Sequence, residues 1–370
     1  MLFVHDHKFI EYEKNIYTLG SLNNQLFKRY ENIFGEVTII ANKVQSSKPG
    51  VEDNKLTNKQ LFLFKQKDIL GVRKLKTIYK LLKSEKYIVL RLPSINGCIV
   101  GIMCLIMRKK YLVEVVGCAK DALNNHGISG KLVAPFITFG VRFVTKRATS
   151  ALYVTEEFLQ SRYPTGGNSI SCSDVILDEP YEQIAKHKKE KSEKLVVGTA
   201  GAINVRYKGQ EFVLKAIQEL KEEKITVEYR LAGSGNSDYL LEIARKLGIE
   251  KQVIFEGLLN RNQIKKYYKG LDIYIQPSLT EGMPRAVIEA MNAGCYCIGT
   301  CVGGIPELVG RSNCFEKKSV QGIKKLIKKY YELDVEQVCK NNYSVVEKFQ
   351  ENALNEKRNK FYKNYMMMVK

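Results

Sequence analysis

Residues 277–291 read Pro-Ser-Leu-Thr-Glu-Gly-Met-Pro-Arg-Ala-Val-Ile-Glu-Ala-Met and are the most informative segment of the chain. The apolar stretch Asp272–Gln276 in front of them predicts a buried strand, and Arg285–Ala293 predicts a helix that Gly294 ends. A Gly- and Pro-containing loop between a parallel strand and a helix presents free backbone N–H groups and the positive helix end. The segment therefore predicts a diphosphate site at the carboxyl edge of a parallel sheet.

Two carboxylates flank this loop, and they indicate what else is bound. Glu281 lies in the loop and Glu289 on one face of the following helix, with seven residues between them. Gly282 lets the backbone approach phosphate, whereas a carboxylate repels it, so each glutamate is expected to bind neutral hydroxyl groups. A nucleotide that carries a sugar has both kinds of group.

Strand-like and helix-like patterns alternate along the chain, which is typical of α/β folds with parallel sheets. In the first half, the predicted strands are Leu2–Val4, Val37–Ile40, Tyr87–Leu90, Tyr111–Val116 and Ala151–Val154, and the predicted helices are Leu22–Phe34, Leu75–Lys83, Ile95–Met107 and Leu132–Thr145. In the second half, the predicted strands are Leu195–Gly198, Val227–Leu231, Val253–Phe255 and Asp272–Gln276, with helices such as Gln210–Glu222 between them.

The length of 370 residues predicts two domains. The expected boundaries are a first domain over 1–164, a polar linker over 165–194, a second domain over 195–340, and a C-terminal helix within 341–370 that packs back on the first domain.

Further motifs follow one another in the second half. They are Arg206-Tyr-Lys-Gly209, Leu231-Ala-Gly-Ser-Gly235, Val253-Ile-Phe-Glu-Gly257 and Val302-Gly-Gly-Ile-Pro-Glu307, together with the Glu281–Glu289 pair. In this order they resemble the retaining GT-B glycosyltransferases of family 4, over about Leu195–Gly310. The resemblance implies two Rossmann-like domains with a cleft between them, and transfer of a sugar from a UDP- or GDP-sugar to a saccharide or lipid-linked glycan.

The resemblance also implies roles for individual residues. Glu289 would bind ribose hydroxyls, Glu281 the donor sugar, and Lys208 with Arg206 the charge of the leaving diphosphate. The catalytic candidates are thus Lys208, Glu281 and Arg206. The remaining donor-binding candidates are Gly20, Gly201, Gly233, Leu259, Gly282, Met283 and Pro284.

Acceptor-side candidates come from the first half. Many members of the family that the chain resembles have a histidine at the end of the strand that begins at Tyr111, where this chain has Val116-Gly117. Glu114, Asp121 and His126 are therefore the candidates here. In a retaining mechanism the leaving phosphate can accept the proton, so no protein base is required. The chain has no D-x-D motif, and its nine cysteines and four histidines lack zinc spacing, so we expect no metal and no cofactor beyond the nucleotide-sugar co-substrate.

The net charge of +20 suits an anionic membrane surface, a phosphorylated substrate or nucleic acid. Nucleic acid is disfavoured because no binding module is recognised. A helix with Arg73, Lys74, Lys76, Lys80 and Lys83 around Leu75, Ile78, Leu81 and Leu82 leaves membrane docking open. No signal peptide and no spanning segment are recognised, so the expected location is the cytoplasm or the inner face of its membrane.

Two alternatives remain at this point. Sugar-nucleotide epimerases share the two-domain architecture, and a basic, non-enzymatic nucleic-acid-binding protein would share the charge. Epimerisation of the donor without an acceptor would identify the first. Salt-sensitive binding without sequence preference would be the minimum expected of the second.

Overall fold

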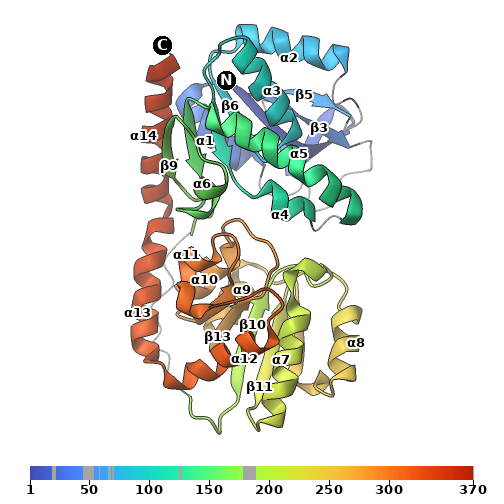
Figure 1. The fold of residues 1–370 in the computed structure, drawn as a ribbon, viewed down its shortest axis with the longest axis vertical. Coiled ribbons are helices and arrows are strands. Elements are labelled where there is room, and N and C mark those ends of the chain that lie inside the picture. Colours follow the sequence, from blue (N-terminus) through green and yellow to red (C-terminus); the bar gives the residue numbers. More distant parts are fainter. Residues whose placement is uncertain are drawn as a thin grey trace. The chain divides into compact units, whose positions relative to one another are not determined.

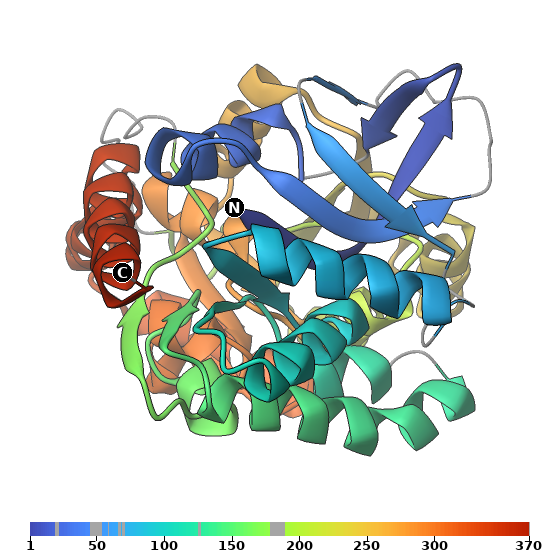
Figure 2. The same ribbon diagram turned by 90° about the horizontal axis from the view of Figure 1, so that it is seen from above.

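The computed structural model describes residues 1–18, 22–44, 54–57, 59–65, 68, 71–124, 127–177 and 189–369. The chain forms two compact units, shown in Figures 1 and 2. The first unit contains Met1–Cys172 and Asn355–Lys370, and the second contains Ser173–Leu354. Each unit is an α/β domain with its own sheet, as the alternating sequence pattern predicts.

The first unit is built on a mainly parallel sheet. The parallel strands lie side by side in the order β5, β3, β1, β6, β7, β8, β9, while β2 and β4 add an antiparallel extension beside β1. Their bounds are β1 Leu2–Tyr12, β2 Asn15–Thr18, β3 Thr38–Val44, β4 Asn54–Leu56, β5 Gln60–Phe64, β6 Ile88–Leu92, β7 Leu112–Val115, β8 Ser150–Tyr153 and β9 Asn168–Ser171.

Helices cover this sheet, and small residues bring two of them close together. The helices are α1 Asn24–Phe34, α2 Val72–Ser84, α3 Ile95–Ile106, α4 Ala119–Asn124, α5 Gly127–Lys146 and α6 Phe158–Arg162. A Cβ atom on Gly101 of α3 would lie 2.4 Å from Val144 of α5, and one on Gly140 of α5 would lie 3.3 Å from Cys98 of α3. Glycine at these positions therefore allows α3 and α5 to lie side by side (Figure 1).

The C-terminal helix α14, Glu351–Val369, completes the first unit from Asn355 onward. Tyr362 and Tyr365 are buried, and the Tyr362 ring stacks on Tyr30 of α1 at 5.9 Å between ring centroids. The Tyr365 hydroxyl accepts a hydrogen bond from the Ile88 N–H and donates one to the Ile88 carbonyl oxygen. Aromatic burial and these bonds hold the end of the chain on a sheet formed by its beginning.

The second unit has a fully parallel sheet with the order β12, β11, β10, β13, β14, β15. These strands are β10 Leu195–Ala200, β11 Val227–Ala232, β12 Val253–Gly257, β13 Ile273–Gln276, β14 Tyr296–Thr300 and β15 Cys314–Phe315. The helices are α7 Gln210–Glu222, α8 Asp238–Lys246, α9 Arg261–Lys269, α10 Arg285–Asn292, α11 Ile305–Val309, α12 Val320–Lys329 and α13 Val335–Val346. The strand order reverses between β10 and β13, where open α/β sheets bind their ligands.

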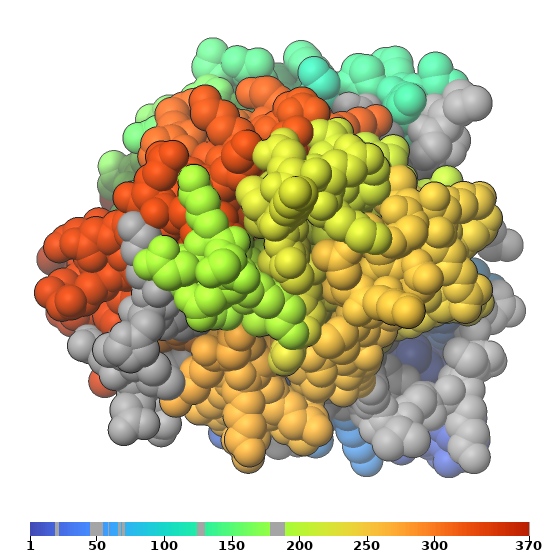
Figure 3. All heavy atoms as spheres, turned by 90° about the horizontal axis from the view of Figure 1, so that it is seen from below, coloured from blue at the N-terminus to red at the C-terminus, as the bar shows by residue number. Residues whose placement is uncertain are grey.

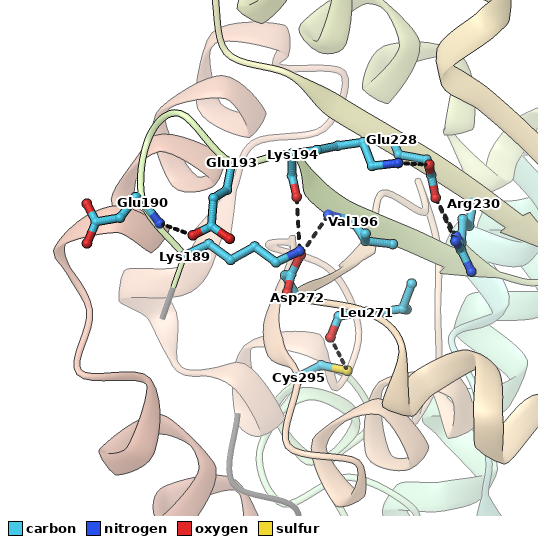
Figure 4. Close-up of polar contacts among 10 residues, drawn as sticks. All are labelled: Lys189, Glu190, Glu193, Lys194, Val196, Glu228, Arg230, Leu271, Asp272 and Cys295. Carbon is cyan, nitrogen blue, oxygen red and sulfur yellow. Dashed lines mark hydrogen bonds and ion pairs between the residues drawn. The ribbon is translucent and has the colours of Figure 1, made fainter. Parts of the chain in front are cut away.

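The opposite, amino edge of this sheet is held by Asp272 (Figure 4). Its carboxylate accepts hydrogen bonds from the Val196 N–H and from Lys189 Nζ, both at 2.7 Å. Lys189 also donates to the Lys194 carbonyl oxygen. One carboxylate thus joins the start of β10, the start of β13 and the segment 189–194, which lies at the surface in Figure 3 (light green).

Several predicted boundaries differ from the structure, and three of the differences change the description of the fold. The first domain does not end at 164, because β9 pairs with β8 and extends the first sheet into the predicted linker 165–194. The second unit continues beyond 340, to Leu354, and only the last part of the predicted segment 341–370 belongs to the first unit. Strand β1 continues to Tyr12, eight residues beyond the predicted Val4, because its polar continuation forms an antiparallel hairpin with β2.

Candidate active site

The loops that follow β10 and β13 meet at the carboxyl edge of the second sheet. A short 3-10 helix, η1 Arg206–Lys208, ends at Gly209, whose φ of 74° favours glycine. A Cβ atom at position 209 would lie 2.2 Å from the Pro277 carbonyl oxygen, and the Leu279 N–H donates to the Tyr207 carbonyl oxygen at 2.8 Å. Gly209 therefore allows the two loops to touch.

This contact places Lys208 beside Glu281. Lys208 Nζ lies 2.7 Å from Glu281 Oε1, and the two side chains are 21% and 14% exposed. The pair is thus partly open to solvent, so an incoming anion can reach the lysine without a rearrangement of the sheet. The structure brings together the two residues to which the resemblance gives roles at the diphosphate and at the donor sugar.

Gln276, which no sequence motif indicated as a site residue, also contacts Glu281. It is buried at the end of β13, and its Nε2 donates to Glu281 Oε1 at 3.0 Å and to Ser278 Oγ at 2.9 Å. The one sequence signal was a polar residue that ends an otherwise apolar strand. Glu281 therefore has a hydrogen-bond donor other than Lys208.

The orientation of the Gln276 amide is set by Tyr274. The Ala200 N–H donates to the Tyr274 hydroxyl at 3.3 Å, and that hydroxyl donates to Gln276 Oε1 at 2.7 Å. Burial raises the pKa of Tyr274 well above its usual value, so the hydroxyl stays protonated. A continuous chain of hydrogen bonds thus runs from β10 through β13 to the carboxylate.

The loop over residues 277–284 is supported by the last residue of β14 and by the segment that follows this strand. The Gly304 N–H donates to the Gly282 carbonyl oxygen at 2.7 Å, and Thr300 Oγ1 donates to the Ser278 carbonyl oxygen at 2.6 Å. Gly303 has a φ of 57°, and a Cβ atom there would lie 2.3 Å from the Glu281 carbonyl oxygen. The loop ends at Pro284, directly before the first residue of α10.

Glu289 lies in α10, about one helical turn after the first residue of this helix, Arg285. Its Oε2 accepts a hydrogen bond from the Tyr268 hydroxyl at 3.0 Å, and its Oε1 lies 3.9 Å from Arg285 Nη1. Burial raises the pKa of Tyr268 well above its usual value, which keeps this donor protonated. The carboxylate is therefore oriented by a buried tyrosine from α9.

The remaining donor-side candidates lie at the ends of neighbouring strands. A Cβ atom on Gly233, after β11, would lie 2.0 Å from the Gly201 carbonyl oxygen, so the loops after β10 and β11 pack against each other. Leu259 is half-buried after β12. Arg206 is exposed, and its guanidinium carbon lies 4.8 Å from the ring centroid of Tyr239. Gly20 lies outside the described residues.

A family model described as "Glycosyl transferases group 1" matches residues 181–364. Protein CapJ of Staphylococcus aureus is 32% identical over 340 residues, which cover 88% of this chain and 85% of CapJ. The chain belongs to the group 1 glycosyltransferases.

Solved structures agree on the fold of this group 1 glycosyltransferase. The lipopolysaccharide outer core galactosyltransferase WaaB superposes with a TM-score of 0.68 at 13% identity, over 100% of this chain and 99% of WaaB. Anabaena HepE, solved in complex with UDP, superposes with a TM-score of 0.65 at 15% identity, over 98% and 99% of the two chains. The predicted GT-B fold with two Rossmann-like sheets is confirmed.

Two of the acceptor-side candidates of the glycosyltransferase, Glu114 and Asp121, lie in the described part of its first unit. Glu114 is 2% exposed, and its carboxylate accepts hydrogen bonds from Arg91 at 3.0 Å, from the Tyr30 hydroxyl at 2.7 Å and from the Tyr362 hydroxyl. Its burial argues against the predicted contact with an acceptor and for a structural role. Asp121 of α4 pairs with Arg162 at 3.3 Å, and His126 lies outside the described residues.

Two findings bear on metal binding and on membrane spanning, and both concern only the described part of the glycosyltransferase. No group of three or more His, Cys, Asp and Glu side chains there is arranged to hold a metal ion. No helix there is both long enough and apolar enough to cross a bilayer. Metal-independent transfer stays a prediction.

Proposed function

We propose that this glycosyltransferase moves a sugar from a UDP- or GDP-sugar to a saccharide or lipid-linked glycan, with retention of the anomeric configuration. The observation that carries the proposal is the Lys208–Glu281 pair at the point where the strand order reverses. A cation suits a diphosphate, and a carboxylate beside it suits sugar hydroxyls.

The different roles proposed for Lys208 and Glu281 follow from their opposite charges. When a donor binds, the Lys208 ammonium turns from Glu281 to the diphosphate and stabilises the negative charge that grows as the glycosidic bond breaks. Glu281 then exchanges the lysine for a sugar hydroxyl while Gln276 continues to donate to it. Glu289, oriented by Tyr268, accepts hydrogen bonds from ribose hydroxyls.

The proposed setting is assembly of a cell-surface polysaccharide at the cytoplasmic side of the membrane. Two similarities support it: WaaB is a lipopolysaccharide galactosyltransferase, and HepE was solved with UDP. The partners would be the nucleotide-sugar and the growing glycan, without nucleic acid and without a resident metal or cofactor.

Thermal shift with UDP-, GDP- and ADP-sugars tests the donor site. We expect stabilisation by one nucleotide class, retained in the presence of EDTA, and weakened in Glu289→Gln. Absence of stabilisation by all of them would overturn the donor-site assignment. Proton NMR of the product then reports the anomeric configuration, and an inverted product would overturn retention.

Incubation of the enzyme with donor alone separates transfer from epimerisation. We expect slow hydrolysis at most, and transfer only after an acceptor glycan is added. A donor converted to its epimer without an acceptor would replace the transferase proposal with an epimerase.

A further inference from the structure

The first unit places a histidine at the carboxyl edge of its sheet. Strand β1 pairs with β6 over Leu2–Val4, and His5 is the next residue of β1. Phe3, two residues before it, packs its ring on Phe27 and Tyr30 of α1, at 5.4 and 5.2 Å between ring centroids. Side chains two residues apart in a strand point to the same face of the sheet. The imidazole of His5 therefore lies on the α1 face, just beyond the part of β1 that pairs with β6.

The charge next to His5 is that of Arg91, which belongs to a buried network. Arg91 follows Leu90, the last residue of β6 that pairs with β1, and its Nη1 lies 3.0 Å from Glu114 Oε2. Burial, followed by the charges of Arg91 and His7, lowers the pKa of His5 to about 3. A pKa this low leaves the imidazole neutral at physiological pH.

Backbone geometry determines which nitrogen of this neutral imidazole carries the proton. The His7 N–H donates to His5 Nδ1 at 2.9 Å, so Nδ1 is the acceptor nitrogen. The hydrogen is then on Nε2, because a neutral imidazole has one N–H. His5 is therefore a hydrogen-bond donor at Nε2, and this nitrogen cannot take up a proton from a reacting hydroxyl.

The Nε2–H group of His5 is available to a ligand. The side chain is half-buried, and Nε2 has no hydrogen-bond acceptor among the residues that the structure describes. The polar side chains beside it in β1 are already engaged. Asp6 accepts a hydrogen bond from the Asn96 N–H, and His7 Nε2 lies 2.6 Å from Thr18 Oγ1. A half-buried donor of this kind gains a hydrogen bond from a ligand that brings an acceptor oxygen.

We propose that His5 binds the acceptor, with its Nε2–H donating to the oxygen of a sugar hydroxyl. The inference rests on the proposed function and names a residue for its second substrate. A neutral donor suits an uncharged hydroxyl, whereas the diphosphate of the nucleotide-sugar calls for a cation such as Lys208.

This contact orients the hydroxyl without removing its proton. One lone pair of the hydroxyl oxygen accepts the His5 N–H, and the other attacks the anomeric carbon. The bond from that carbon to the leaving phosphate breaks with its electron pair, and the hydroxyl proton passes to a phosphate oxygen. His5 is thus the same neutral donor before and after the transfer.

Nuclear magnetic resonance of the histidine side chains tests the protonation state without turnover. Full-length protein labelled with ¹⁵N-histidine contains four such residues, and the His5 signals are those absent from His5→Gln. We expect a proton on Nε2 and no titration between about pH 5 and about pH 9. A proton on Nδ1, or titration near the ordinary pKa of histidine, would overturn the proposal.

Methyl glycosides of glucose, galactose and N-acetylglucosamine are the acceptor probes for the same spectra. We expect at least one of them to shift the Nε2–H resonance of His5 in the absence of any nucleotide. No shift with any of them, together with an unchanged acceptor KM in His5→Leu, would overturn the proposal.

Substitutions test the same contact in the transfer reaction. His5→Leu removes the donor and is expected to raise the KM for the acceptor glycan by about five- to tenfold, with a smaller change in kcat. His5→Gln keeps an N–H group and is expected to recover most of this loss. His7→Phe is the matched control, because it keeps the backbone N–H that bonds His5 and removes the imidazole that contacts Thr18. Equal losses in His5→Leu and His5→Gln, or a larger rise of KM in His7→Phe, would show a structural role and overturn the proposal.

Donor binding separates this proposal from the proposed function. His5 lies in the first unit, so the thermal shift with the nucleotide-sugar is expected to be unchanged in His5→Leu. A weakened thermal shift with an unchanged acceptor KM would place His5 at the donor and overturn the proposal. Absence of any thermal shift in the wild type would overturn the proposed function, whereas the response of the His5 resonance to the methyl glycosides would still test the acceptor contact.

Discussion

Each unit of the molecule holds a glutamate against a cation, and the two pairs differ in what surrounds them. Glu114 and Arg91 are 2% and 8% exposed at the centre of the first sheet, and the hydroxyls of Tyr30 and Tyr362 also donate to the Glu114 carboxylate. Glu281 and Lys208 lie at the end of the second sheet, partly open to solvent. A carboxylate whose partners all come from the buried interior stabilises a fold, whereas one at a strand end can exchange partners with a ligand.

The same substitution at both glutamates gives the largest expected effect and tests this contrast. Glu114→Gln removes the carboxylate charge that faces the buried Arg91 guanidinium, so the free energy of unfolding of the first unit should fall by about 3–5 kcal/mol. Glu281→Gln should lower stability by less than about 1 kcal/mol, because Lys208 can reach water, while transfer slows. Urea unfolding of both variants measures the difference. Equal losses of stability would break the comparison.

Lys208→Met tests the proposed role of the Lys208 charge in the transfer reaction. The variant keeps much of the apolar stem but removes the charge that faces the diphosphate, so kcat should fall by about 10²–10³-fold, with a smaller change in stability. Arg206→Met on the same 3-10 helix is the matched control, since its guanidinium lies on the Tyr239 ring. If Arg206→Met lost as much activity as Lys208→Met, the assignment of the charge to Lys208 would be wrong.

Gln276→Leu tests whether Glu281 depends on its buried support. Loss of the amide leaves Glu281 with Lys208 as its partner in this network, and it leaves the Tyr274 hydroxyl with the Ala200 carbonyl oxygen, at 3.4 Å, as its acceptor. We therefore expect kcat to fall about tenfold. Gln276→Glu places a second carboxylate against Glu281 and should shift the pH profile of transfer, which a purely structural role would not do. An unchanged pH profile together with full activity would remove Gln276 from the site.

Tyr268→Phe should have the smallest effect, and it concerns donor affinity alone. The variant removes one hydrogen bond to Glu289, so the dissociation constant of the nucleotide-sugar should rise by a few-fold, about 1 kcal/mol. Isothermal titration calorimetry of the wild type, Tyr268→Phe and Glu289→Gln measures the dissociation constant of the nucleotide-sugar for each protein. A larger loss in kcat than in affinity would argue against ribose binding by Glu289.

The second unit could be predicted more fully than the first because its signals are local. Periodicity predicts α7 at its observed bounds, Gln210–Glu222, and the loop between β13 and α10 follows from adjacent glycine and proline. Lys208 and Glu281 follow from separate motifs that the strand order brings together. Gln276 was missed because its amide is oriented by the Tyr274 hydroxyl, which in turn accepts a hydrogen bond from the Ala200 N–H. Ala200 lies on a different strand, so no local sequence motif contains this arrangement.

The first unit resists prediction because its decisive contacts join distant positions. Glu114 looks like a polar residue at the end of a strand, and only the folded chain shows Tyr30 and Tyr362 around it, 84 and 248 residues away. Leu132, Phe136 and Phe139 of α5 have the spacing of an ordinary core helix but are exposed, so sequence periodicity does not distinguish a face in the core from one at the surface.

The contact between Tyr362 and Glu114 also has a consequence for synthesis on the ribosome. At about 5–20 residues per second, the 248 residues between them take roughly 12–50 s to be added. During that interval Glu114 can meet Arg91 and Tyr30 but not Tyr362, while residues 173–354 of the second unit are being made. The unit that begins first in the chain is therefore the last to have all its parts.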